Sequence, residues 1–225
     1  MTDAISTLES LLASRYSCRA YKTEQVPREI IERILNAAQR TASWCNSQPW
    51  QVTITSGEAT RQFRDVLYPV AAAGTPNSGD FEFPREYRGA YLERRRESGF
   101  QLYNTLGIVR GDKAAYAEQA LQNFNFFGAP HVAIITTDEA LGVYGAVDCG
   151  GYVTNFMMAA QALGLATVPQ AALAFHAKVV REHFGMGDDR RVVCGISFGF
   201  PDVEAKVNSY RTNRAALPEV ATFVE

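Results

Sequence analysis

Apolar residues recur at helical spacing in several parts of the chain. The clearest pattern follows Pro27, where polar residues separate the members of one apolar face: Ile30, Ile31, Ile34, Leu35 and Ala38. Proline is favoured in the first turn of a helix, so this pattern predicts a helix that begins at Pro27. The same reasoning predicts helices over residues 5–13, 57–70, 85–127 (broken near Gly107 and Gly111), around 152–163 (ending at Gly164) and 174–184.

Four shorter segments read as strands. Residues 50–55 alternate in polarity as a half-buried strand does, and residues 131–135 form a continuous apolar run. A short strand is expected to lead to Pro169, and residues 192–200 are expected to form the last core strand before an extended tail with an apolar patch at 220–224. Helices and strands mix without a regular βαβ rhythm, which favours the α+β class.

The length of 225 residues suits a single domain, 1–225. Between residues 73 and 80 the composition shifts to Gly, Pro, Asn and Ser, which marks a loop. We therefore expect residues 73–127 to be a helical insertion, and the segment most suited to act as a lid.

Composition excludes several classes of protein. A formal net charge of −2 gives no electrostatic case for nucleic-acid binding. No apolar run reaches the roughly 20 residues that a membrane helix needs, and the N-terminal residues lack the pattern of a secretory signal. The four cysteines are scattered and form no CxxC pair. We expect a cytoplasmic protein without a metal site and without membrane or nucleic-acid partners.

The usual catalytic motifs are missing. The sequence has no GxGxxG after a strand, no P-loop, no GxSxG elbow and no HExxH helix, and its three histidines have no evident partners. With so few candidate acids, bases and nucleophiles, the chemistry is better supplied by a bound cofactor. We expect no catalytic side chain.

The first informative segment is Arg15-Tyr16-Ser17-Cys18-Arg19. Two arginines four residues apart, with a hydroxyl between them, can converge on one phosphate through charge-assisted hydrogen bonds. The alternative is the solvated end of a surface helix.

The second segment runs from Ala42 to Trp50 and reads ASWCNSQPW. Its hydroxyl and amide groups, next to aromatic residues, suit a flat heteroaromatic ring with polar edges. A turn before a strand would also explain these residue types.

The third segment combines an amphipathic helix around Asn155, the sequence Pro169-Gln170-Ala171-Ala172 and the strand end at 199–202. Small residues after Pro169 let backbone N–H groups approach a ligand. The tail then adds late polar and basic groups: Asn208, Arg211, Thr212 and Arg214.

Together these segments resemble the nitroreductase family of FMN-containing, NAD(P)H-dependent flavoproteins. The resemblance lies in the R-x-S-x-R start, the N-x-Q-P-W block, the helix ending in A-L-G-L-x-T-x-P, and the G-F-P-D strand end before an arginine-rich tail. Each motif is weak alone, but their order and spacing along most of the chain are specific. The resemblance implies an α+β fold with a mixed or antiparallel central sheet flanked by helices, in an intertwined homodimer.

The resemblance also implies residue roles. The FMN phosphate is expected at Arg15, Tyr16, Ser17 and Arg19, with Arg214 or its neighbour Arg211 from the tail. The flavin is expected to meet a loop of the other subunit, which places the active site at the dimer interface; the loop residues are Ala42, Ser43, Trp44, Asn46 and Gln48, the last in a supporting role. A backbone N–H near flavin N5 is expected from the turn formed by Pro169, Gln170, Ala171 and Ala172.

Three features leave alternatives open. Trp44 and Cys45 are bulkier than the residues often found in this loop of the family, so the ring pocket is expected to be narrower. Asn123, Phe124 and Asn125 are candidates for lining the substrate cavity, although a buried helix-to-strand junction explains them as well. Residues 94–96, all arginines, suit the 2′-phosphate of NADPH, but a solvated helix face is the commoner reason for such a run.

The expected function is reduction of nitroaromatic or quinone-like acceptors by NAD(P)H through FMN, with ping-pong kinetics. One alternative keeps the fold and changes the reaction to reductive dehalogenation or flavin-dependent oxidation. Another is a flavin-binding protein without turnover, and a third is an α+β dimer without a cofactor.

Overall fold

The computed structural model describes residues 3–225, and its centre is an antiparallel sheet of four strands. The spatial order is β1 (Gln51–Ser56), β2 (His131–Asp138), β4 (Arg190–Gly199) and β3 (Ala166–Gln170). Every pair of neighbouring strands is antiparallel. This confirms the α+β class, and the sheet is antiparallel rather than mixed.

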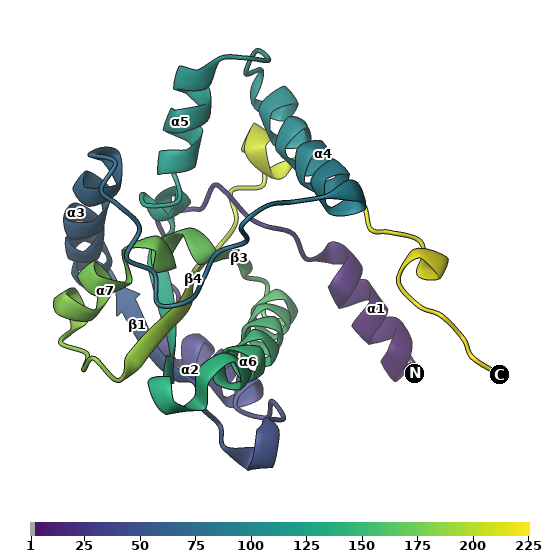
Figure 1. Ribbon diagram of the computed structural model, residues 1–225, viewed down its shortest axis with the longest axis horizontal. Coiled ribbons are helices and arrows are strands. Elements are labelled where there is room, and N and C mark those ends of the chain that lie inside the picture. The colour runs from purple at the N-terminus through teal and green to yellow at the C-terminus, as the bar shows by residue number, and fades with distance from the viewer. Residues whose placement is uncertain (1–2) are drawn as a thin grey trace.

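Helices cover both faces of the sheet (Figure 1). On β2, Val132 and Ile134 point into one core cluster and Ala133 and Ile135 into the other, because successive side chains of a strand alternate between faces. The second cluster is covered by α2 (Arg28–Ala38) and α6 (Gly142–Ala162), and the first by α3 (Glu58–Ala72) and α7 (Ala177–Phe184).

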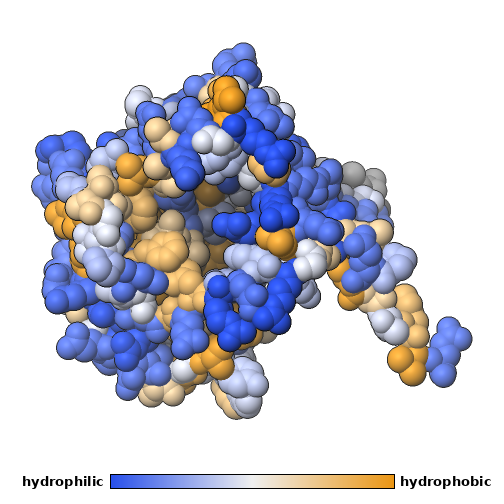
Figure 2. All heavy atoms as spheres, turned by 45° about the horizontal axis from the view of Figure 1, so that its top comes forward, coloured by the Kyte–Doolittle hydropathy of each residue, from blue (hydrophilic) through white to orange (hydrophobic). Residues whose placement is uncertain are grey.

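Three further helices lie outside these layers. Helices α4 (Gly89–Leu106) and α5 (Lys113–Leu121) extend away from the sheet, and α1 (Ala4–Ser14) lies to one side with the C-terminal tail (Figure 1). None of the three contains a buried residue. Apolar residues of α1 and the tail are accordingly exposed, and Figure 2 shows an arm with apolar residues that projects from the body.

Most elements lie where the sequence pattern predicts them, and three differ. Helix α6 begins at Gly142, ten residues before the predicted helix. The sequence pattern does not predict these first turns, because they carry exposed apolar residues where a polar side is expected. The helix expected over 174–184 begins with a 3-10 segment, η4 (Ala171–His176). The loop over 42–49 contains a 3-10 turn, η1 (Trp44–Asn46).

One glycine ends the helix before β3, and another lets η4 pack on the sheet. Gly164 follows the end of α6 and has a φ of +76°, a backbone conformation that residues with a Cβ rarely adopt. A Cβ at Gly195 of β4 would collide with the side chain of Leu173 in η4. Glycine at this position lets η4 pack directly on the sheet.

Candidate cofactor site

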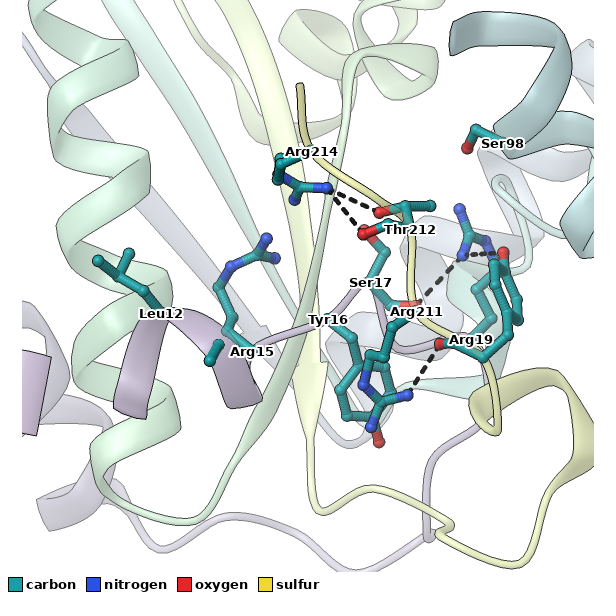
Figure 3. Close-up of a pocket in the computed structure, with 11 residues that line it drawn as sticks. Leu12, Arg15, Tyr16, Ser17, Arg19, Ser98, Arg211, Thr212 and Arg214 are labelled. Carbon is teal, nitrogen blue, oxygen red and sulfur yellow. Dashed lines mark hydrogen bonds between the residues drawn. The ribbon is translucent and has the colours of Figure 1, made fainter. Parts of the chain in front are cut away.

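A cavity of about 280 Å³ lies between the end of α1, the segment after it and the C-terminal tail (Figure 3). Residues that are almost 200 positions apart in the sequence meet here. The lining includes Leu12, Arg15, Tyr16, Ser17, Arg19, Ser98, Tyr210, Arg211, Thr212 and Arg214. The structure thus brings together the whole predicted phosphate set.

The segment after α1 is held against the edge strand β3. Cys18 N–H donates to Thr167 O at 3.0 Å, and Ser17 forms a parallel bridge with the same threonine. Because Cys18 is fully buried, the alternation of an extended chain turns Ser17 and Arg19 away from the core and toward the cavity.

Asn208 fastens the tail to this segment. Its Oδ1 accepts a hydrogen bond from Arg19 N–H at 2.8 Å, and its Nδ2 donates to Ala20 O at 2.9 Å and to Asp202 O at 2.8 Å. These bonds bring the arginines of the tail to the R-x-S-x-R segment.

Hydrogen bonds and an aromatic ring fix the side chains of Arg19 and Arg211. Arg19 Nη1 donates to Ser17 O at 3.2 Å and to Tyr210 Oη at 3.1 Å. The guanidinium of Arg211 lies 3.7 Å from the centroid of the Tyr16 ring and donates to Asn208 O at 2.8 Å. Burial raises the pKa of Tyr16 to about 12, so this phenol adds no negative charge to the site.

Arg15 and Arg214 repel one another. Burial first, and the charge of Arg214 second, hold the pKa of Arg15 below its ordinary value. Within residues 3–225, none of the four guanidinium groups forms an ion pair with a carboxylate. The cavity is therefore an uncompensated cationic site, and a phosphate dianion would relieve the repulsion.

At the end of β3, the side chain of Gln170 forms hydrogen bonds within the protein. Its Nε2 donates to Asn123 O at 2.8 Å, its Oε1 accepts from the Ser197 hydroxyl, and the residue is 2% exposed. What the turn formed by Pro169, Gln170, Ala171 and Ala172 can offer a ligand is the backbone N–H of Ala171 and Ala172, because the first N–H groups of a helical segment lack intrahelical acceptors. Pro169 has no N–H, and Gln170 is the last residue of β3. Ala171 is exposed at the beginning of η4.

The predicted ring-binding loop lies far from this site within one chain. Trp44 N–H donates to the carboxylate of Asp148, whereas Ser14, next to Arg15, accepts from Gln161 at 3.1 Å. Asp148 and Gln161 are 13 residues apart on α6, about 20 Å at 1.5 Å per residue. A single chain does not bring Ala42, Ser43, Trp44 and Asn46 to the arginine cavity.

The side chain of Gln48 forms hydrogen bonds that stabilise the loop itself. Its Nε2 donates to Asn46 O at 3.2 Å and its Oε1 accepts from Gln39 Nε2 at 2.9 Å. The side-chain amide of Asn46 has no hydrogen-bond partner within residues 3–225, and the residue is exposed. Asn46 is thus available to a ligand, and Gln48 supports the loop.

The candidate substrate residues have different surroundings. Phe124 is 9% exposed and belongs to the core cluster, with its ring tilted against that of His176. Asn125 bonds to Gln122 at 3.1 Å, and Asn123 receives the bond from Gln170. These contacts favour the buried junction that the sequence left as the alternative.

Sequence reasoning missed four residues of the cavity: Leu12 and Ala13 at the end of α1, Ser98 and Tyr210. Tyr210 contacts Arg19, and its position directly before Arg211 was the only available signal. Ser98 comes from α4, in a stretch where the sequence offers no motif. A second cavity, of about 960 Å³, lies between α4 and the tail and shares Ser98, Thr212 and Arg214 with the first.

No helix within the described residues is long and apolar enough to span a membrane. The same residues contain no group of three His, Cys, Asp or Glu side chains that is suited to a metal ion.

Comparison with known proteins defines the class. The sequence model described as "Nitroreductase family" matches residues 12–200, and the chain belongs to this family. Nitroreductase NfnB of Mycolicibacterium smegmatis is 35% identical over 223 residues, which cover 98% of this chain and 94% of the relative. A 4-nitrobenzoate reductase of Pseudomonas putida is 31% identical over 206 residues, covering 92% and 90%.

A solved structure extends the comparison to three dimensions. The crystal structure of the FMN-dependent nitroreductase NfnB from Mycobacterium smegmatis, in complex with NADPH, superposes with a TM-score of 0.94. It is 33% identical to this chain and covers 99% of this chain and 100% of its own. The family expected from the sequence motifs is confirmed.

Proposed function

We propose that this protein is an FMN-dependent oxidoreductase that uses NAD(P)H to reduce nitroaromatic or quinone-like acceptors by a ping-pong mechanism. The observation that carries the proposal is the cationic cavity in which Arg15 and Arg214 face each other without a carboxylate. Support comes from a neighbour of nearly identical fold that is FMN-dependent and was crystallised with NADPH. The relatives also include reductases of 4-nitrobenzoate.

The residues of the cavity fit the phosphate of FMN. Arg15 and Arg214 supply charge that the fold leaves uncompensated, while Ser17 and Arg19 are turned to the same space by the extended chain. Arg211 reinforces the positive field from its place above Tyr16. The phosphate dianion would then make several charge-assisted hydrogen bonds at once.

The backbone at the beginning of η4 is suited to the ring of the cofactor. When bound, FMN accepts a hydride from NAD(P)H and passes the electrons to the acceptor. The backbone N–H groups of Ala171 and Ala172 would donate to the polar edge of the ring, where negative charge develops on reduction. Gln170 keeps this turn fixed, because its side chain donates to Asn123 O and accepts from the Ser197 hydroxyl.

The working unit is a homodimer with a cofactor site at each end of its interface. A stripe of exposed residues runs along α6: Val143 at 66%, Val147 at 62%, then Gly150 and Thr154. Helix α1 adds Ile5, Leu8 and Leu12, each about half exposed, and the tail adds Phe223 at 81%. Large apolar surfaces of this kind are typical of obligate interfaces.

Dimerisation would also bring the loop around Trp44 to a cofactor, which it does not reach within its own chain. The loop around Trp44 and Asn46 lies about 20 Å from the arginines of its own chain, measured along α6. A second copy packed on the α6 stripe would place its own loop at this chain's cofactor. Residues 73–127 would then cover the acceptor as a lid, and the protein would act in the cytoplasm.

Steady-state kinetics test the proposal. NADPH or NADH oxidation is followed at several fixed concentrations of 4-nitrobenzoate and of a benzoquinone, with FMN-loaded protein. Parallel lines in double-reciprocal plots are expected, because the first product leaves before the acceptor binds. Oxidation of NAD(P)H that does not depend on either acceptor would contradict the proposal.

A further inference from the structure

Helix α6 has two neighbouring faces with different tasks. On each face the residues follow one another at intervals of four, three and four positions, the spacing of residues that share a helix side. One face consists of Tyr144, Asp148, Gly151 and Asn155. The other, displaced by one residue, is the exposed stripe of Val143, Val147, Gly150 and Thr154.

The first face holds the loop of its own chain, residues 41–48. Asn155 Nδ2 donates to Thr41 Oγ1 at 2.7 Å. A Cβ at Gly151 would lie 3.2 Å from the Thr41 methyl group, so glycine at this position allows the loop to lie close to the helix. These two contacts fix the beginning of the loop.

Asp148 and Tyr144 hold the middle of the loop. The two carboxylate oxygens of Asp148 lie 3.1 and 3.3 Å from Trp44 N and accept its N–H. The Trp44 and Tyr144 rings meet edge to face, with centroids 4.6 Å apart and planes at 81°. Both residues are 58% exposed, so this pair adds little burial, and the bond to Asp148 is the polar contact that joins the Trp44 backbone to α6.

The backbone beyond Trp44 needs such support. Cys45, Asn46 and Gln48 have φ values of +51°, +54° and +48°, a left-handed conformation that is uncommon for residues with a Cβ, although asparagine adopts it more readily than the others. A second anchor is a chain of hydrogen bonds in which Trp50 donates to Gln39 and Gln39 donates to Gln48. The loop is thus fixed at both ends in an unfavourable conformation, and conformations of this kind cluster at functional sites.

We infer that Asp148 is a positioning residue, which fixes Trp44 and Asn46 beside the exposed stripe of α6 so that they meet the flavin bound by a second copy of the chain. This inference rests on the proposed function. Three observations carry it: the bond from Trp44 N–H to the carboxylate, the side-chain amide of Asn46, which has no hydrogen-bond partner within residues 3–225, and the place of the loop next to the face that a second copy would cover. Asp148 acts through the loop and touches neither cofactor nor acceptor.

The test compares the wild type with Asp148→Ala and Asp148→Asn. Asparagine keeps one carbonyl oxygen as acceptor for Trp44 N–H, and alanine removes it. Asp65→Ala is the matched control, because Asp65 is an exposed aspartate of α3 whose ion pair with Arg61 lies on the helix surface. FMN affinity is measured by quenching of flavin fluorescence, at protein concentrations where light scattering shows the wild type as a dimer.

Loss of a hydrogen bond to a charged group is expected to raise the Kd for FMN about tenfold in Asp148→Ala. Asp148→Asn is expected to recover most of that loss, and Asp65→Ala to stay within about twofold of the wild type. The melting temperature of the FMN-free protein is expected to be the same in all four proteins, because the loop is exposed and contributes little to the core.

Three results would overturn the inference. In the first, Asp148→Ala binds FMN as tightly as the wild type does. In the second, Asp148→Ala is a monomer or its FMN-free form melts earlier than Asp65→Ala, which would assign the carboxylate to association or folding. In the third, the wild type binds no FMN; this refutes the proposed function as well, and it differs from the other two because every protein, including the control, fails alike.

Discussion

Substitution of Arg15 by glutamine tests the account of the cationic cavity. In the FMN-free protein Arg15 is half-buried and faces Arg214, and both its burial and that repulsion lower its pKa. Glutamine removes the charge and keeps a polar side chain. The FMN-free protein is therefore expected to be as stable as the wild type or slightly more stable.

The effect on FMN binding has the opposite sign. A hydrogen bond to a charged group contributes about 1.5–3 kcal/mol, so the Kd for FMN is expected to rise roughly 10- to 100-fold. At FMN equal to 100 times the wild-type Kd, bound FMN stabilises the wild type by about 2.7 kcal/mol, and a tenfold weaker variant by about 1.4 kcal/mol. The variant is thus expected to lose about 1.3 kcal/mol of stability, and to lose it only when FMN is present.

The assay is urea unfolding with and without FMN, together with a fluorescence titration for the Kd. Arg33→Gln serves as the control, because Arg33 is an exposed arginine of α2 outside the cavity. An unchanged Kd in Arg15→Gln would refute the reasoning. So would a loss of stability of the same size in the FMN-free protein, because Arg15 would then act in folding and not in anion binding.

Three further predictions concern the fold that supports the site. Burial lowers the pKa of His131 from its ordinary value of 6.5, and its Nε2 accepts the Val26 N–H at 2.9 Å, so the native state holds this histidine neutral. The unfolded chain then binds the proton first, and stability is expected to fall as the pH drops below 6.5; urea unfolding at pH 5 and 7 should show a smaller difference in His131→Gln. Asp80, whose side chain is 4% exposed, is paired with Arg181, and Asp80→Asn is expected to cost about 3–5 kcal/mol in the same assay by leaving a buried charge without its partner. Gly195→Ala is expected to displace Leu173 and lower stability by about 1–3 kcal/mol, and an unchanged unfolding midpoint would contradict this account of the packing between β4 and η4.

The sequence predicts the elements well because their patterns are local. The apolar face after Pro27 and the continuous run from residue 131 each depend on neighbours a few positions away, and both match α2 and β2. The beginning of α6 escaped prediction because Val143 and Val147 are apolar yet exposed. A pattern that assumes burial of apolar residues fails where a helix exposes them, as the first turns of α6 do.

In the candidate site, too, the sequence predicts the residues that follow a local pattern and misses those that depend on long-range contacts. Residue types and spacing identified Arg15, Ser17 and Arg19, and the structure places them in one cavity with the tail arginines. The contribution of Tyr210 and the bond between Asp148 and Trp44 are long-range contacts, and no local pattern encodes them. The same holds for the separation of the loop from the arginine cavity, which depends on the length of α6.

The most direct test of the central claim is an absorbance spectrum of the purified protein after incubation with FMN and desalting, followed by anaerobic addition of NADPH and then NADH. The account predicts a protein-bound flavin spectrum that bleaches with at least one nucleotide and returns when a nitroaromatic acceptor is added. A protein that stays colourless after desalting would contradict it, and so would a bound flavin that neither nucleotide bleaches.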